Sequence, residues 1–128
     1  MKKHFFFFIL LLFPLLAAAQ TYKYIGVEDG LSNRRVYAIQ KGPKGYMWFL
    51  THDDIDRYNG KEFKHYKLMD GEEEVNSMMS LSWLYTDAKG RLWEIGKQGR
   101  VFCYESKHDR FQLVYKPVSY THLRAHET

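Results

Sequence analysis

The chain has 128 residues, with 19 Lys or Arg, 15 Asp or Glu and a net charge of +4. Two of the basic residues are Lys2 and Lys3, and without them 17 basic residues face 15 acidic ones, a net charge of +2. No basic stripe remains, and the largest charge cluster, Asp70 to Glu74, is acidic, so the composition gives nucleic-acid binding no support. The single cysteine, Cys103, excludes an internal disulfide and is expected to be a small buried strand residue.

The first segment has the three-part pattern of a secretory signal peptide. Lys2 and Lys3 precede an apolar run from Phe5 to Leu16, and Ala17-Ala18-Ala19 supplies the small residues of a cleavage site. The run is short for a membrane span. We therefore expect residues 1–19 to be a signal peptide that exports the rest of the chain, with an uncleaved N-terminal anchor as the alternative.

After residue 20 the pattern predicts an all-β chain. Short segments rich in β-branched and aromatic residues alternate with Gly, Asp, Asn and Lys, and no long stretch keeps a helical period. The first four expected strands are Val36–Gln40, Tyr46–Thr51, Ile55–Tyr58 and Glu62–Tyr66. The next four are Leu81–Thr86, Arg91–Ile95, Arg100–Tyr104 and Phe111–Tyr115.

The connections group these strands into two antiparallel units, about residues 29–68 and 72–116. Asn59-Gly60 is expected to form a tight type I′ hairpin, because both central positions of that turn need positive φ. The segment from Lys67 to Ser80 is expected to be the one long loop, and it carries the chain from the first unit to the second.

The two units repeat one pattern, in which Lys-Gly-x-x-Trp is followed by a Tyr and a Phe. Trp48 and Trp93 lie 45 positions apart, which is the spacing of four-stranded β-propeller blades. We interpret both tryptophans as packing residues between blades, with sugar stacking as the alternative. The expected structural anchors of the repeat are Trp48, Tyr58, Phe63, Trp93, Tyr104 and Phe111.

The first unit resembles the two-component regulator propeller repeat. The resemblance rests on Asp29-Gly30-Leu31-Ser32-Asn33, on the run from Lys44 to Phe49, and on Arg57-Tyr58-Asn59-Gly60. It implies the periplasmic sensor region of a hybrid histidine kinase of the Bacteroidetes type, anchored in the inner membrane. It also implies an oligosaccharide ligand derived from glycan breakdown, a homodimeric parent chain, and transcriptional control through a phosphorelay.

Some positions depart from the repeat, and other functions stay open. Leu50 stands where the repeat usually has Gly, Asp54-Ile55 stands where it has Gly-Leu, and the second unit lacks a GLSN element. A secreted propeller enzyme, such as a quinone-dependent dehydrogenase or a polysaccharide lyase, is the main alternative. The same propeller joined to a different signalling output is another.

The sequence offers few candidates for chemistry. It contains no phosphate-binding loop, zinc-spaced Cys/His set or nucleophile elbow, so we expect no catalytic, cofactor or metal residues and no enzyme activity in this part of the parent protein. His52-Asp53-Asp54 is the one compact group that could bind a ligand, although a polar turn explains it as well. Arg34 and Arg35 are candidates because arginine pairs with carboxylates and sugar acids.

The last segment, residues 117–128, breaks the blade pattern. From Val118 to Thr128 it resembles the translation of a transposon-end sequence joined to a sequencing adapter. We therefore expect native coding to end at about Lys116 or Pro117, with a polar linker to a third blade as the alternative.

Overall fold

The computed structural model describes residues 2–16, 20–75, 79, 82–96 and 98–118. Helix α1 (Lys2–Leu16) comes first, and two short 3-10 turns, η1 (Val27–Asp29) and η2 (Pro43–Gly45), flank the first strand. The strands are β1 (Val36–Lys41), β2 (Met47–Thr51), β3 (Ile55–Tyr58), β4 (Phe63–Tyr66), β5 (Leu68–Asp70), β6 (Glu73–Val75), β7 (Trp83–Thr86), β8 (Leu92–Ile95), β9 (Val101–Glu105) and β10 (Arg110–Tyr115).

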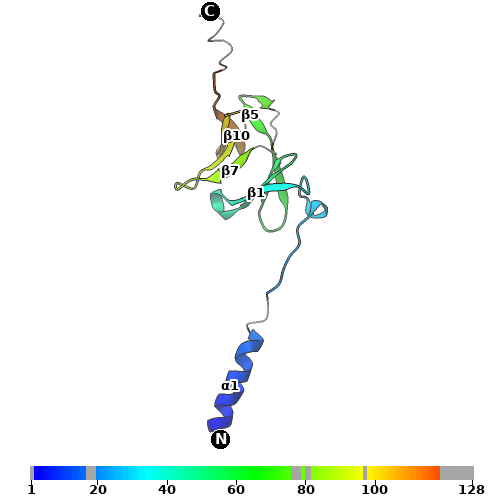
Figure 1. Ribbon diagram of the computed structural model, residues 1–128, viewed down its shortest axis with the longest axis vertical. Coiled ribbons are helices and arrows are strands. Elements are labelled where there is room, and N and C mark those ends of the chain that lie inside the picture. The colour runs from blue at the N-terminus through cyan, green and yellow to red at the C-terminus, as the bar shows by residue number, and fades with distance from the viewer. Residues whose placement is uncertain (1, 17–19, 76–78, 80–81, 97, 119–128) are drawn as a thin grey trace, which may run out of the picture.

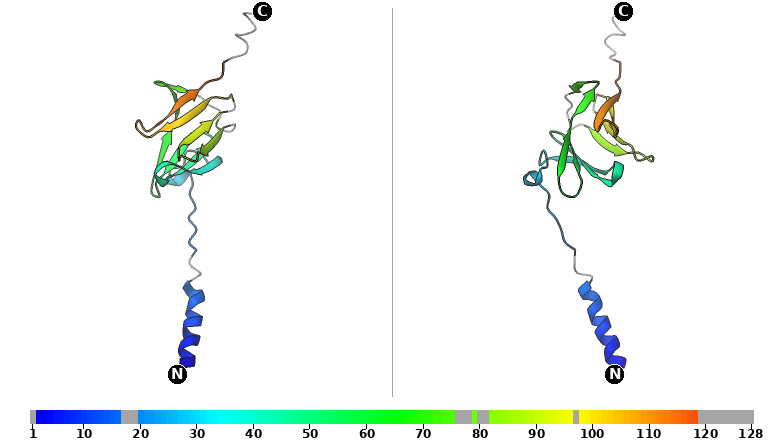
Figure 2. Two further views of the ribbon diagram at one scale, coloured as in Figure 1. Left: turned by 90° about the vertical axis from the view of Figure 1, so that its left-hand side faces the viewer. Right: turned by 180° about the vertical axis from the view of Figure 1, so that it is seen from behind.

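The strands form two sheets that pack against each other (Figures 1 and 2). The first is an antiparallel meander in the order β1-β2-β3-β4, and the second has the order β6-β5-β10-β9-β8-β7. Strands β1 and β7, which begin the two meanders, lie side by side. The Thr86 hydroxyl joins them by donating to the Lys41 carbonyl over 2.9 Å. The predicted all-β fold and both four-stranded meanders are confirmed.

The expected long loop between the units is wrong in part, because Lys67 to Ser80 includes the hairpin β5–β6. Strand β5 pairs in parallel with β10, with Leu68 opposite Phe111, so the chain leaves the first sheet at Tyr66 and enters the second at Leu68. Leu68 is 1% exposed, and this burial stabilises the extra pairing. The turn needs Gly71, whose φ is +63°. Residues 76–78 and 80 lie outside the described part of the chain.

The Asn59-Gly60 turn joins β3 and β4 as expected, but it is not the expected type I′ turn. Only Gly60 has positive φ, at +98°, while Asn59 and Lys61 do not, so the turn lacks the two consecutive positive φ values of type I′. The Asn59 side chain accounts for the difference, because its Oδ1 accepts the backbone N–H groups of Lys61 and Glu62, both at 2.9 Å.

The core lies between the two sheets. Trp48 is fully buried, and its ring centroid lies 5.1 Å from that of Tyr66, 4.7 Å from that of Tyr104 and 5.7 Å from that of Phe111. Leu50, Ile55, Leu92 and Phe102 fill the rest of the space and are also fully buried. One face of each sheet therefore packs against the other sheet.

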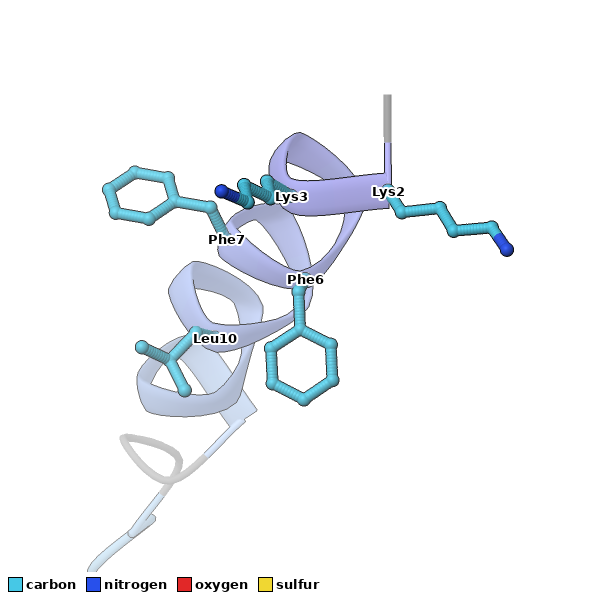
Figure 3. Close-up of a pocket in the computed structure, with 5 residues that line it drawn as sticks. All are labelled: Lys2, Lys3, Phe6, Phe7 and Leu10. Carbon is cyan, nitrogen blue, oxygen red and sulfur yellow. The ribbon is translucent and has the colours of Figure 1, made fainter.

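Helix α1 is separated from the sheets by an extended segment (Figure 1). A hollow lined by Lys2, Lys3, Phe6, Phe7 and Leu10 lies on its surface, with the phenylalanine rings pointing outward (Figure 3). Within the described residues, no helix combines the length and the hydropathy that a membrane span requires. The hollow is the surface of a single helix and forms no binding cavity.

Candidate functional site

The segment before β1 is fastened to the first sheet by polar contacts. Ser32 donates its backbone N–H to the Asp56 carboxylate over 2.7 Å, and its hydroxyl bonds to that of Thr51 over 2.6 Å. Leu31 beside it is 6% exposed. The Thr51 hydroxyl in turn holds the β2–β3 turn, because it lies 3.0 Å from the Asp54 carbonyl and 3.1 Å from the Asp54 nitrogen. These contacts give the Asp-Gly-Leu-Ser-Asn element a structural role.

The ligand-binding candidates gather at one end of the first sheet. The His52 backbone N–H donates to the Arg35 carbonyl over 3.0 Å, and the Asn33 amide donates to the Asp53 carboxylate over 3.0 Å. Arg34, Arg35, His52 and Asp53 are exposed there, whereas Asp54 is half-buried. A turn and the start of the neighbouring strand thus present two arginines, a histidine and a carboxylate to solvent together.

The three turn residues predicted as one cluster have separate partners. His52 Nδ1 lies 2.9 Å from the Tyr37 hydroxyl, and Asp54 instead joins Asp56 and His65. Ligand atoms of Asp54, Asp56 and His65 all lie within 4.8 Å of one another. His52, Asp53 and Asp54 therefore contact different neighbours, and their role in ligand binding stays a prediction.

The Asp54–Asp56–His65 group already has a cation beside it. Asp54 forms an ion pair with the Lys67 ammonium, and this contact raises the pKa of Lys67. Asp56 is fully buried, and its carboxylate lies 2.7 Å from His65 Nδ1. Lys67 thus lies against the Asp54 carboxylate, and His65 lies against the Asp56 carboxylate.

A second cluster joins the two sheets around Asp109, which lies in the β9–β10 turn with φ of +50°. Its carboxylate accepts the hydroxyls of Tyr66, at 2.8 Å, and Tyr104, at 2.6 Å. It also pairs with the Lys64 ammonium and with Arg57 Nη1, at 3.4 Å. Three of these four donors come from the first sheet. The Asp109 carboxylate, which belongs to the second sheet, therefore links the two sheets.

The aromatic surroundings of Arg57 extend this cluster. The guanidinium carbon lies 4.8 Å from the Tyr46 ring centroid, 5.5 Å from that of Tyr66 and 5.8 Å from that of Trp48. Burial raises the pKa of Tyr66, and the hydrogen bond to Asp109 raises it further. Partial burial alone would raise the pKa of Asp109, but hydrogen bonds from Lys64, Tyr104 and Tyr66 outweigh it and hold the pKa below its usual value.

We expect Asp109→Asn to lower the free energy of unfolding by roughly 1 to 2 kcal/mol at neutral pH, because Asn keeps one acceptor but loses the charge. Because the pKa of Asp109 is lowered in the folded state, its ionised carboxylate adds to the free energy of unfolding above about pH 4. This stabilisation is lost as the pH falls through the folded-state pKa. Denaturant unfolding of the full parent protein at pH 7 and pH 3 should show the difference in unfolding free energy between wild type and variant shrinking on acidification. If the difference in unfolding free energy between wild type and variant is the same at both pH values, the Asp109 charge does not stabilise the fold.

The predicted anchors occupy three environments. Trp48, Tyr104 and Phe111 lie in the core between the sheets. Tyr58 and Phe63 are half-buried on the opposite face of the first sheet, where their rings stack at 4.7 Å. Trp93 is half-buried on the outward face of the second sheet and does not contribute to the buried core.

Trp48 is buried and Trp93 is only half-buried because the turns that precede them differ at one matching position. That position is Gly42 in the first unit and Asp87, 45 residues later, in the second. The Asp87 carboxylate accepts Trp93 Nε1 over 3.0 Å and Arg91 Nε over 2.7 Å. The hydrogen bond from Trp93 is the main cause of the lowered pKa of Asp87. Gly42 stands at the matching place in the first unit, where a Cβ would lie only 2.5 Å from a Trp48 ring carbon. With Gly42 at this position, the first unit lacks a carboxylate to accept the tryptophan N–H, and the Trp48 ring packs directly against the Gly42 backbone.

Comparison with known proteins gives the repeat a family. Residues 30–53, which run from the Asp-Gly-Leu-Ser-Asn element through β1 and β2 to the next turn, match the family model described as "Two component regulator propeller". These residues are thus similar to a two-component regulator propeller repeat. No curated protein matches the chain. In this propeller repeat, the matched residues include Leu31, Trp48, Leu50 and Thr51, which are all buried.

Solved structures contain the same propeller repeat fold. The extracellular domain assigned to the hybrid two-component system BT3049 from B. thetaiotaomicron is similar, with 21% identity, a TM-score of 0.57 and coverage of 71% of this chain and 13% of that chain. The extracellular domain assigned to the hybrid two-component system BT4673 from the same organism has 21% identity, a TM-score of 0.51 and coverage of 67% and 12%. The chain thus spans about an eighth of the length of these domains, and its two sheets are propeller blades.

Proposed function

We propose that these blades belong to the extracytoplasmic sensor region of a hybrid histidine kinase that detects glycan breakdown products and regulates transcription through a phosphorelay. The observation that supports this most strongly is the two-component regulator propeller repeat at residues 30–53. The fold similarity to extracellular domains assigned to hybrid two-component systems points the same way. The signal-peptide pattern at residues 1–19 agrees with export. The full parent chain is an inner-membrane homodimer in this proposal.

The exposed end of the first blade is the candidate ligand surface. Arg34 and Arg35 lie beside His52 and Asp53, at the end where the β2–β3 turn meets the start of β1. Guanidinium groups form paired hydrogen bonds with carboxylates, and hydroxyl-rich sugars accept the same donors. An oligosaccharide with acidic units would use both arginines.

The experiment uses the full gene recovered from source DNA. The complete ectodomain is titrated calorimetrically with neutral and acidic oligosaccharides, and transcription is compared between wild-type and deletion strains grown on the same polysaccharides. We expect one oligosaccharide class to bind and its utilisation genes to depend on the sensor. If no oligosaccharide binds and the deletion changes no transcription, the proposal fails. Turnover of a bound oligosaccharide would instead identify a propeller enzyme.

For the ligand surface, we expect the double variant Arg34→Ala/Arg35→Ala to weaken binding of that oligosaccharide about tenfold or more, because hydrogen bonds to charged groups are lost. Lys61→Ala is the matched control, since Lys61 is exposed in the β3–β4 turn at the other end of the sheet. If the double variant and the control bind the oligosaccharide with equal affinity, the ligand does not bind at Arg34 and Arg35. The sensor proposal would still stand, with its ligand site on another part of the propeller.

A further inference from the structure

Glu94 is a carboxylic acid in the seam, the apolar core where the two sheets pack against each other. It lies in β8, where buried and half-buried residues alternate, so it shares the inward face of this strand with Leu92. Its cross-strand neighbours are Leu84 in β7 and Phe102 in β9. These three neighbours belong to the buried core, and Glu94 itself is fully buried. A titratable group thus stands among side chains that cannot pair with it.

The repeat does not require an acid at this position. Glu94 directly follows Trp93, and the residue 45 positions earlier is Phe49, which directly follows Trp48. Phe49 is half-buried, and its ring centroid lies 5.8 Å from that of Phe63. An apolar side chain therefore suits this place in the strand, and the carboxyl group of Glu94 distinguishes the second blade from the first.

The surroundings of the carboxyl group leave its charge without compensation. Neither Oε1 nor Oε2 of Glu94 has a hydrogen-bond partner among the described residues. Burial raises the pKa of Glu94, and the Ser82 hydroxyl and the charge of Arg100 offset only part of this effect. Arg100 instead donates from Nη2 to the Gln98 side-chain oxygen over 2.8 Å. An ionised Glu94 would therefore be a buried charge without an ion pair in the described part of the chain, which is costly.

The other charged groups of the seam lie at its opposite end. Glu94 is close to the β8–β9 turn, whereas Asp109 belongs to the β9–β10 turn, past the far end of β9. There Asp109 pairs with Arg57 and Lys64 of the first sheet. The buried side chains that the first sheet adds to the core are uncharged, namely Trp48, Leu50, Ile55 and Tyr66. One end of the seam thus holds a carboxylate with cationic partners, and the other holds a carboxyl group without them.

We infer that Glu94 makes the seam between the two blades sensitive to pH: it is the neutral acid while the sheets are packed, and its ionisation at higher pH loosens the structure around β8. The folded state keeps this proton at pH values at which the locally opened state has lost it. The free energy of opening therefore falls as the pH rises above about 4, and it levels off above the folded-state pKa.

The expected response is local opening around β8, because the Asp109 contacts fasten the other end of the seam. It needs no ligand, and it does not depend on the proposed sensor function.

The test measures hydrogen exchange in the full parent protein, resolved to peptides that cover β7, β8 and β9. Wild type and Glu94→Gln are compared in the same buffer at each pH, so the chemical pH dependence of exchange cancels. We expect the ratio of wild-type to variant exchange rates to rise at least about fivefold between about pH 4 and about pH 8, because only the wild type gains a buried charge. A ratio that does not rise with pH would overturn the inference.

Two further variants separate the buried acid from other effects. Glu94→Leu places an apolar side chain among apolar neighbours and should give the same rising ratio, so it serves if the buried amide of Glu94→Gln prevents folding. Glu62→Gln is the matched control, because it removes a negative charge from an exposed position in the β3–β4 turn. Its ratio over the same peptides should stay constant with pH. A ratio that rises equally for Glu62→Gln would overturn the inference, because the effect would then come from net charge.

Infrared difference spectroscopy reads the protonation state directly. At about pH 5.5 an exposed glutamate is almost fully ionised. We expect the wild-type parent protein at this pH to show the carbonyl stretch of a protonated carboxylic acid that is missing from Glu94→Gln. If the two spectra differ only in carboxylate bands, Glu94 is ionised in the packed seam and the inference fails.

Discussion

Replacing Trp48 with alanine is expected to destabilise the full ectodomain by about 3 to 5 kcal/mol, the usual cost of removing a buried aromatic side chain. Trp48 is fully buried and contacts three aromatic rings, two of them from the second blade. Its loss therefore leaves a cavity in the seam between the blades. Chemical denaturation followed by circular dichroism measures the effect.

Trp48→Phe is the matched control for this cavity. It keeps one ring in the seam, and it removes no hydrogen bond because Trp48 Nε1 has no partner among the described residues. We expect it to cost less than half of the loss seen for alanine. A Trp48→Ala protein with the unfolding midpoint of wild type would show that the two blades do not depend on this seam.

Truncation to residues 20–116 is expected to abolish cooperative thermal unfolding. Two blades leave one apolar face uncovered on each side: Trp83 is 73% exposed and Tyr85 is 54% exposed on the second sheet, and Ile39 is 54% exposed on the first. Neighbouring blades of a closed ring cover such faces, and without them the apolar surface stays in water.

Differential scanning calorimetry and gel filtration of the truncated chain check this expectation. The full ectodomain is the control and should unfold in a sharp transition. We expect a broad transition or association for residues 20–116. A soluble monomer with a sharp melt would contradict the expectation and would show that one seam between two blades is enough for folding.

Much of the fold could be predicted because the local signals agree. The expected strand Ile55–Tyr58 has the same bounds in the structure, and the other described strand bounds shift by only one or two residues. Alternation of apolar and polar residues, with Gly at the turns, decides such strands locally. The hairpin β5–β6 was not predicted, since its pairing depends on β10, more than 40 residues away in the chain.

The polar clusters could be predicted less well, because they combine residues from different strands and different blades. Asp56 and His65 could have been found, since the Asn59-Gly60 hairpin makes them cross-strand neighbours. Asp109 gave no such signal, because its partners Lys64 and Tyr66 come close only after the two sheets pack. Residues 119–128, which include most of the tail with the adapter resemblance, lie outside the described part of the chain.

The Asp109 cluster has a consequence for the proposed sensor function. Lys64, Tyr66 and Arg57 of one blade converge on a carboxylate of the next, and β5 continues the backbone of the first sheet into the second. A hinge at this seam would have to break both sets of contacts at once. The two blades should therefore move as one rigid body, so a ligand would transmit its signal through displacement of the whole unit relative to other domains rather than through opening between these blades.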